Sequence, residues 1–81
     1  MTHTVFLFAR ARDLADAERV AVELPPGSTV ADLHAALAAQ FPPMAALLDR
    51  SAIAVNHDSA DAGRVLDDGD EIAVIPPVSG G

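Results

Sequence analysis

The last two residues of the chain, Gly80 and Gly81, have the types and the position best suited to chemistry. Neither has a Cβ atom, so the terminal carboxylate can enter a channel too narrow for side chains. The same lack of side chains leaves the carboxylate open to a nucleophile or to the phosphorus of a nucleotide. Chain ends are also often disordered and rich in glycine. The terminus alone therefore supports two interpretations, a reactive group and an inert tail.

The segment before the glycines favours the reactive group. Pro76-Pro77 fixes φ at two successive residues, which stiffens the base of the tail and projects it from the domain. At roughly 3.3 Å per residue, residues 76–81 can carry the carboxylate about 20 Å beyond the last strand. We therefore expect a folded domain at 1–75 and an extended tail at 76–81 that delivers Gly81 into another protein's active site.

The other chemically active side chains form no convincing site. Cysteine is absent, which excludes disulfides, Cys-based zinc sites and a thiol nucleophile within the chain. His3, His34 and His57 lack the spacing of metal ligands, so we predict solvated surface histidines and no metal site. The acidic run 67–71 lacks the spacing of a calcium loop and its distal Glu, and is interpreted as a turn with positive φ at Gly69.

Composition restricts the class of protein and of partner. A chain of 81 residues with 51% hydrophobic residues can form one small domain around a single core. A net charge of −7 disfavours nucleic acid, anionic lipid and phosphorylated metabolites as ligands, and favours a partner with a basic face. There is no apolar run of membrane-spanning length and no basic segment at the start. We therefore expect no membrane association, no signal peptide and a cytoplasmic location.

Residue patterns predict strands at both ends of the domain and one main helix between them. Thr29 and Asp32 form a capping-box variant at the start of the helix, and Pro42-Pro43 ends it. Apolar residues recur inside the helix at helical spacing, namely Val30, Leu33, Leu37 and Phe41. The remaining predicted elements are strands at 4–10, 19–24, 52–56 and 71–75, a very short strand at 65–66, a loop at 12–17 and a short helical turn at 44–48. This order predicts an α+β fold with a mixed sheet packed on the helix.

Alternation along the first strand predicts a docking surface. Val5 and Leu7 share one face of that strand, so Phe6 and Phe8 share the other. If the helix covers the Val5 face, Phe8 lies outward beside Ile75 of the last strand. Exposed aromatic and aliphatic side chains that lie together are typical of a docking patch. The alternative is a second small core, in which Phe6 would be buried.

Over nearly its whole length the chain resembles the small, sulfur-carrying subunits of molybdopterin synthase (the MoaD family), which have the ubiquitin-like β-grasp fold. The ending, from an Asp-Gly-Asp-Glu turn through a strand to Pro-Pro-Val-Ser-Gly-Gly, carries most of the resemblance. The matching segments are Val5-Phe6-Leu7-Phe8-Ala9-Arg10-Ala11-Arg12-Asp13-Leu14, Thr29-Val30-Ala31-Asp32-Leu33, Val55-Asn56 and Asp68-Gly69-Asp70-Glu71-Ile72-Ala73-Val74-Ile75-Pro76-Pro77-Val78-Ser79-Gly80-Gly81.

The resemblance implies a sulfur carrier that is not itself a catalyst. An activating enzyme would use ATP to adenylate the Gly81 carboxylate, and a sulfur donor would replace AMP to give a thiocarboxylate. The carrier would then donate sulfur to a cyclic pyranopterin monophosphate in the large subunit, within a heterotetramer. No cofactor would be bound to the chain itself. The reactive end would consist of Gly81 and Gly80, and the residues in contact with partners would be Phe8, Ile75, Pro76, Pro77, Val78 and Ser79.

Other functions remain open at this point. The chain could carry sulfur for thiamine synthesis, tRNA thiolation or cysteine synthesis, although the Pro-Pro-Val-Ser-Gly-Gly ending and the length favour molybdopterin. It could be a ubiquitin-like modifier whose Gly81 is joined to lysines of target proteins. It could also be an interaction module with an inert tail.

Overall fold

A computed structural model describes residues 1–77. The expectations for Val78, Ser79, Gly80 and Gly81 therefore lie outside the described residues.

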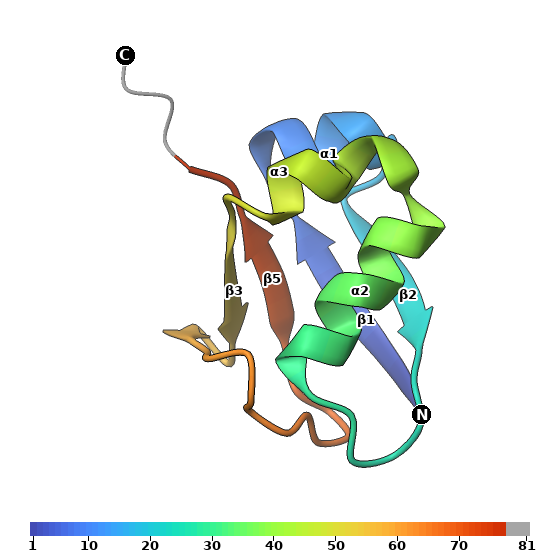
Figure 1. Cartoon of the computed structure of the whole chain (residues 1–81), viewed down its shortest axis with the longest axis vertical. Coiled ribbons are helices and arrows are strands. Elements are labelled where there is room, and N and C mark those ends of the chain that lie inside the picture. Colours follow the sequence, from blue (N-terminus) through green and yellow to red (C-terminus); the bar gives the residue numbers. More distant parts are fainter. Residues whose placement is uncertain (78–81) are drawn as a thin grey trace.

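The described part of the chain forms a mixed five-stranded sheet (Figure 1). The strands are β1 (Thr2–Leu7), β2 (Arg19–Glu23), β3 (Ala52–Val55), β4 (Asp58–Ser59) and β5 (Ile72–Ile75), and their order in the sheet is β2-β1-β5-β3-β4. The first and last strands, β1 and β5, are parallel neighbours, whereas the other pairs are antiparallel. The α+β fold with a mixed sheet is confirmed.

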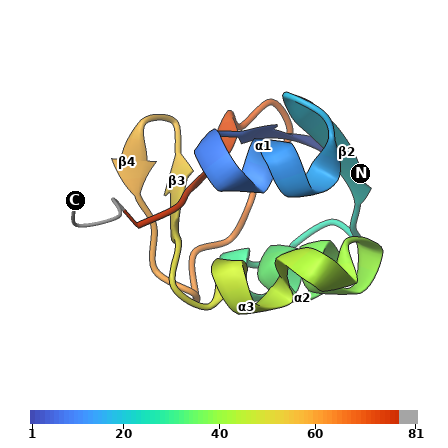
Figure 2. The ribbon, with the colours of Figure 1, turned by 90° about the horizontal axis from the view of Figure 1, so that it is seen from above.

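The main helix, α2 (Val30–Gln40), lies in a layer on one side of the sheet, as Figure 2 shows from above. The predicted capping box is present. The Asp32 amide donates to Thr29 Oγ1 at 3.3 Å, and the Thr29 amide donates to Asp32 Oδ2 at 2.9 Å. These bonds satisfy amides that the helix itself leaves without partners. After the two prolines the chain makes the predicted short helical turn, as η1 (Pro42–Met44) and α3 (Ala45–Leu48).

The prediction of a loop at 12–17 was wrong, because helix α1 (Ala9–Ala15) begins directly after Phe8. Strand β1 therefore ends at Leu7, and Ala9 adopts a positive φ of 51° at the corner. Ala11 is fully buried. The spacing of Ala11, Leu14 and Ala15 was the helical signal, but the polar residues between them obscured it.

The region between β3 and β5 also differs from the prediction. Asn56 and His57 have φ of 53° and 72°, and this two-residue turn with two positive φ angles joins β3 to the short strand β4. Val65 makes only an isolated bridge with Thr29, so the predicted strand at 65–66 does not form. The turn at 67–70 is confirmed, with φ of 86° at Gly69.

The core lies between α2 and the sheet face that carries Val5 and Leu7. Its largest fully buried side chains are Leu7, Leu33, Leu37, Met44, Leu48, Leu66, Ile72, Val5, Val22, Val55 and Val74. The prediction that His3 is solvated was wrong, since only 2% of it is exposed. Strand β1 begins two residues earlier than expected, so His3 shares the inward-facing positions of Val5 and Leu7.

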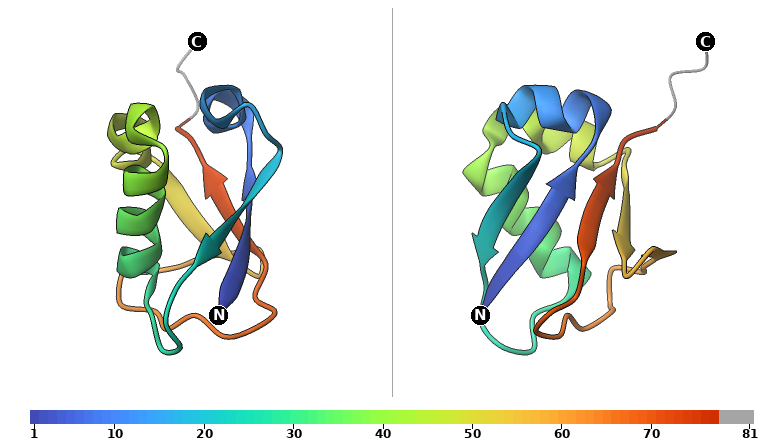
Figure 3. Two further views of the ribbon diagram at one scale, coloured as in Figure 1. Left: turned by 90° about the vertical axis from the view of Figure 1, so that its right-hand side faces the viewer. Right: turned by 180° about the vertical axis from the view of Figure 1, so that it is seen from behind.

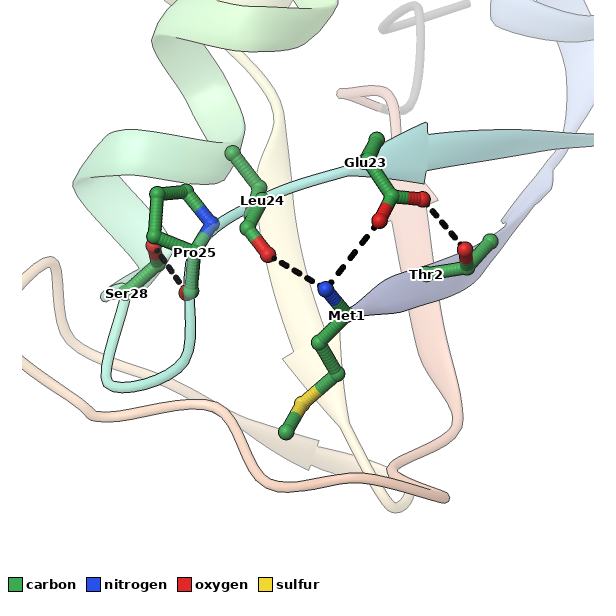
Figure 4. Close-up of polar contacts among 6 residues, drawn as sticks. All are labelled: Met1, Thr2, Glu23, Leu24, Pro25 and Ser28. Atoms are coloured by element: carbon green, nitrogen blue, oxygen red, sulfur yellow. Dashed lines mark hydrogen bonds and ion pairs between the residues drawn. The ribbon is translucent and has the colours of Figure 1, made fainter.

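A polar cluster ties the start of β1 to the end of β2 (Figure 4). The amino group of Met1 contacts Glu23 Oε1 at 3.1 Å and the Leu24 carbonyl at 2.9 Å. Thr2 Oγ1 donates to the other Glu23 oxygen. The bond from Thr2 and the ammonium group of Met1 lower the pKa of Glu23.

No helix within residues 1–77 is long and apolar enough to cross a membrane.

Candidate functional site

The pairing of β1 with β5 brings the two predicted docking residues together. Leu7 is the register partner of Val74, so the residues that follow them, Phe8 and Ile75, lie at the same end of the sheet. Both side chains are about half exposed, 52% for Phe8 and 46% for Ile75. The structure therefore places two large apolar side chains in solvent side by side, as the alternation along β1 predicted.

These two side chains form part of a groove of about 360 Å³ on the sheet face opposite α2. Ala54 and Ala73 are register partners on β3 and β5. Their small side chains create a depression between the larger side chains around them. Phe6, which is half-buried, pairs with Ala73 from the other side. The groove is lined by Phe6, Phe8, Ala54, His57, Glu71, Ala73 and Ile75. Such a surface suits apolar side chains of a protein partner.

The polar end of the groove is a close contact between His57 and Glu71. His57 Nε2 lies 2.7 Å from Glu71 Oε2, and 86% of the histidine side chain is exposed. Sequence reasoning did not place His57, Glu71 or Ala54 in the site. The groove includes them because β3 is the neighbour of β5, a long-range pairing with no local sequence signal.

Asn56 holds this polar end in place. Its side-chain nitrogen Nδ2 donates to Asp70 Oδ1 at 2.9 Å, and its side-chain oxygen accepts from the backbone amide of Glu71 at 2.9 Å. Asp70 Oδ2 accepts from the Asp67 amide at 2.8 Å. The bond from the Asp67 amide, together with the bond from Asn56, lowers the pKa of Asp70. The turn before β5 is thus joined to the turn after β3, which fixes Glu71 relative to His57.

The remaining predicted site residues follow Ile75 in the sequence. Pro76 is half-buried and Pro77 is exposed, directly after Ile75 and next to the apolar end of the groove. The predicted roles of Val78, Ser79, Gly80 and Gly81 stay predictions. Within residues 1–77, no three His, Asp or Glu side chains lie close enough together to hold a metal ion.

A second depression, of about 410 Å³, lies between α2 and β3, away from Phe8 and Ile75. His34, whose Nε2 lies 3.3 Å from Asp49 Oδ1, is among its lining residues. The other lining residues are small or aliphatic, so this depression presents little that could do chemistry.

Comparison with known proteins identifies the family. The sequence profile of the ThiS family matches residues 5–81. The chain is 34% identical to the molybdopterin synthase sulfur carrier subunit of Arabidopsis thaliana, over 95% of this chain and 80% of the relative. It is 39% identical to the Drosophila yakuba protein of the same name, over 95% and 88% of the two chains.

Solved structures show the same fold. SAMP1 from Haloferax volcanii superposes with a TM-score of 0.88 at 29% identity, covering 100% of both chains. A putative molybdopterin converting factor subunit 1 from Pyrococcus furiosus gives a TM-score of 0.87 at 31% identity, covering 96% of this chain and 99% of that one. A protein–protein complex of subunits 1 and 2 of the molybdopterin-converting factor from Helicobacter pylori contains a chain with a TM-score of 0.71 at 27% identity, with full coverage of both. The chain therefore belongs to the ThiS family of ubiquitin-like β-grasp proteins, and within it is a relative of the molybdopterin synthase sulfur carrier subunits.

Proposed function

We propose that this chain is the sulfur carrier subunit of a molybdopterin synthase and that the carboxyl group of Gly81 carries the sulfur. The relatives named as such carriers match the chain over 95% of its length, and the family profile extends through Gly81. The apolar groove beside the exit of β5 supports the proposal, since a carrier must dock on a partner while its terminus enters an active site.

The proposed chemistry takes place at the terminus, in two steps on an activating enzyme. The Gly81 carboxylate attacks the α-phosphorus of ATP, and pyrophosphate leaves, which gives an acyl-adenylate. Hydrosulfide released by a sulfurtransferase then attacks the acyl carbon, the bond to the AMP oxygen breaks, and the products are the thiocarboxylate and AMP. Adenylation is needed because a free carboxylate is a poor electrophile.

In the last step the thiocarboxylate donates its sulfur to a cyclic pyranopterin monophosphate within the large subunit of the synthase. The described surface supports different roles for the two proteins in this step. Its groove is apolar apart from His57 and Glu71, and the whole chain has a net charge of −7. The cations that bind the substrate's phosphate would thus come from the large subunit, and this chain would be a substrate-like subunit that is not a catalyst.

The position of Phe8 and Ile75 is the main structural support for this proposal. They lie side by side, half exposed, at the end of the sheet from which Pro76 and Pro77 continue toward the terminus. A partner that covers them is thereby placed next to the tail. We propose that this partner is the large synthase subunit, in a heterotetramer, and the Helicobacter pylori complex of subunits 1 and 2 is a precedent for such a pairing.

Intact-mass measurement tests the proposal. The chain is incubated with an activating enzyme, ATP and a sulfur donor, and the expected mass gain corresponds to replacement of one oxygen by one sulfur. Variants that lack Gly81, or that carry one residue after it, should not be loaded, whereas their thermal midpoints should stay close to that of the parent. Normal loading of a blocked terminus would exclude Gly81 as the sulfur carrier.

A second candidate function is protein modification, because the SAMP1 structures that superpose on this chain are described as small archaeal modifier proteins. A modifier would form a ladder of conjugates with lysines of other proteins when it is expressed with its activating enzyme. A carrier would give the sulfur-loaded monomer and its complex with the large subunit. The same mass measurement, made on the total protein, separates the two functions.

A further inference from the structure

Strand β2 forms one edge of the sheet, and the charge pattern along its outer side matches that of an antiparallel second copy. Within residues 1–77 it pairs with β1 on one side and with no strand on the other, as the view from behind in Figure 3 shows. Its five residues read Arg-Val-Ala-Val-Glu, with a cation at the first position and an anion at the last. An edge strand offers unpaired backbone groups to any strand that can match it.

The hydrogen bonds to β1 show which residues of β2 face outward. Leu24 exchanges bonds with Met1, and Glu18 accepts from the Leu7 amide, so even-numbered residues bond to β1. In an antiparallel pair, residues that bond to the partner strand alternate with residues whose amide and carbonyl groups face away from that strand. Arg19, Ala21 and Glu23 therefore present their backbone groups at the free edge.

The side chains of these three residues are exposed as well. They lie on the sheet face opposite the core, whereas Val22 is buried toward α2. The side chain of Glu23 is 72% exposed even though it contacts the Met1 amino group. Both the backbone and the side chains of the outward-facing residues are thus accessible, apart from the Ala21 carbonyl, which Gln40 contacts.

We propose that β2 pairs with β2 of a second copy of this chain, antiparallel and centred on Ala21. This register places Arg19 opposite Glu23 of the second copy, and Glu23 opposite its Arg19, around a two-fold axis at Ala21. All paired positions have outward-facing amide and carbonyl groups, so each pair can exchange two backbone hydrogen bonds. Opposite charges directly across a strand pair stabilise it.

One group must move for this pairing to form. Gln40 Nε2, at the end of α2, donates to the outward-facing carbonyl of Ala21 at 3.4 Å. That bond is long, so a backbone amide of the second copy can replace it. Gln40 thus competes with the second copy, and Gln40→Ala should tighten the dimer.

The dimer leaves the proposed docking surface free. The groove lies over β1, β5 and β3, and β2 is at the opposite margin of the sheet. A pair of five-residue strands buries less surface than a stable interface needs, so the dimer is a weak one that forms only at high protein concentration. This inference does not depend on the proposed sulfur chemistry.

Sedimentation equilibrium and amide chemical shifts, measured on the full chain from micromolar to millimolar concentration, test the proposal. The shifts of Arg19, Ala21 and Glu23 should change with concentration. Arg19→Glu should raise the dissociation constant about tenfold or more, because each attractive pair becomes repulsive. The double variant Arg19→Glu/Glu23→Arg, which is again self-complementary, should restore dimerisation.

A mixture of two charge-reversal variants provides the most specific control. Arg19→Glu and Glu23→Arg chains should each be monomeric alone and should form a heterodimer when mixed, since their edges are then complementary. Thermal midpoints of all variants show whether they are folded, which matters for Glu23→Arg because it loses the contacts with Met1 and Thr2. A chain that stays monomeric at millimolar concentration, or a dimer that is unchanged by charge reversal, would overturn the proposal.

Discussion

Phe8 and Ile75 lie side by side because the residues that precede them, Leu7 and Val74, are partners in the parallel pairing of β1 with β5. The two residues are 67 positions apart in sequence (75 − 8), with Phe8 directly after the first strand and Ile75 at the end of the last one. The fold thus assembles an apolar surface at the point where the chain continues toward Gly81.

Phe8→Asp should weaken binding to the large synthase subunit by on the order of 2 kcal/mol or more, because it places a charge in a desolvated contact. It should change the thermal midpoint little, since Phe8 is half exposed in the free chain. Isothermal titration calorimetry measures the loss. Val65→Asp is the matched control, because Val65 is equally exposed but lies outside the groove and should bind normally.

Thr29→Ala should destabilise the domain by about 1 kcal/mol, because it removes the side-chain acceptor at the N-cap of α2. Chemical denaturation gives the change in the free energy of unfolding. Thr29→Ser, which keeps a hydroxyl at this position, should recover most of the loss. A value near zero for the alanine variant would show that the capping box contributes nothing to stability.

Ala11→Asp should destabilise the domain by on the order of 3 kcal/mol or more, because Ala11 is fully buried and an aspartate there would place a charge in the core. The exposed neighbour Arg12 is the control, and Arg12→Asp should be tolerated. If Ala11 were exposed like Arg12, the two substitutions would have similar effects. Urea denaturation distinguishes the two outcomes.

Lowering the pH should destabilise the turn before β5, because Asp70 becomes protonated. The pKa of Asp70 is lower in the folded state, so its contribution to stability is present above the pKa of an unfolded aspartate, about 3.9. That contribution is lost as the pH falls through this value toward the folded-state pKa. Urea midpoints between pH 6 and the acid limit of folding should therefore decline less steeply for Asp70→Asn than for the parent. Asp68→Asn, outside this network, should decline like the parent.

Much of the fold could be predicted from short patterns. Thr29 and Asp32 are three residues apart and form a capping box through local bonds, so the start of α2 was visible in the sequence. The acidic turn at Gly69 is equally local. Helix α1 was missed because its apolar positions are few and small, and their burial depends on contacts with β5 and η1.

The candidate site was only partly predictable. Alternation along β1 correctly gave the exposed side of Phe8, because side-chain direction in a strand has a period of two residues. The inclusion of Ala54, His57 and Glu71 in the groove required the order of the strands and the register of β3 with β5. The burial of His3 depended on the first residue of β1, which the composition of the N-terminus did not reveal.

By itself the sequence determined the local features of this protein: the strand-forming segments, the capped helix, the glycine turn and the Gly-Gly ending with its two prolines. These features depend on the conformational preferences of neighbouring residues, which act over a few positions. The tertiary structure decided which distant residues share a surface: Phe8 with Ile75, His57 with Glu71, and the free edge of β2. Those relationships arise from strand pairing across the whole chain, where the burial of a common core selects one arrangement among many with the same local preferences.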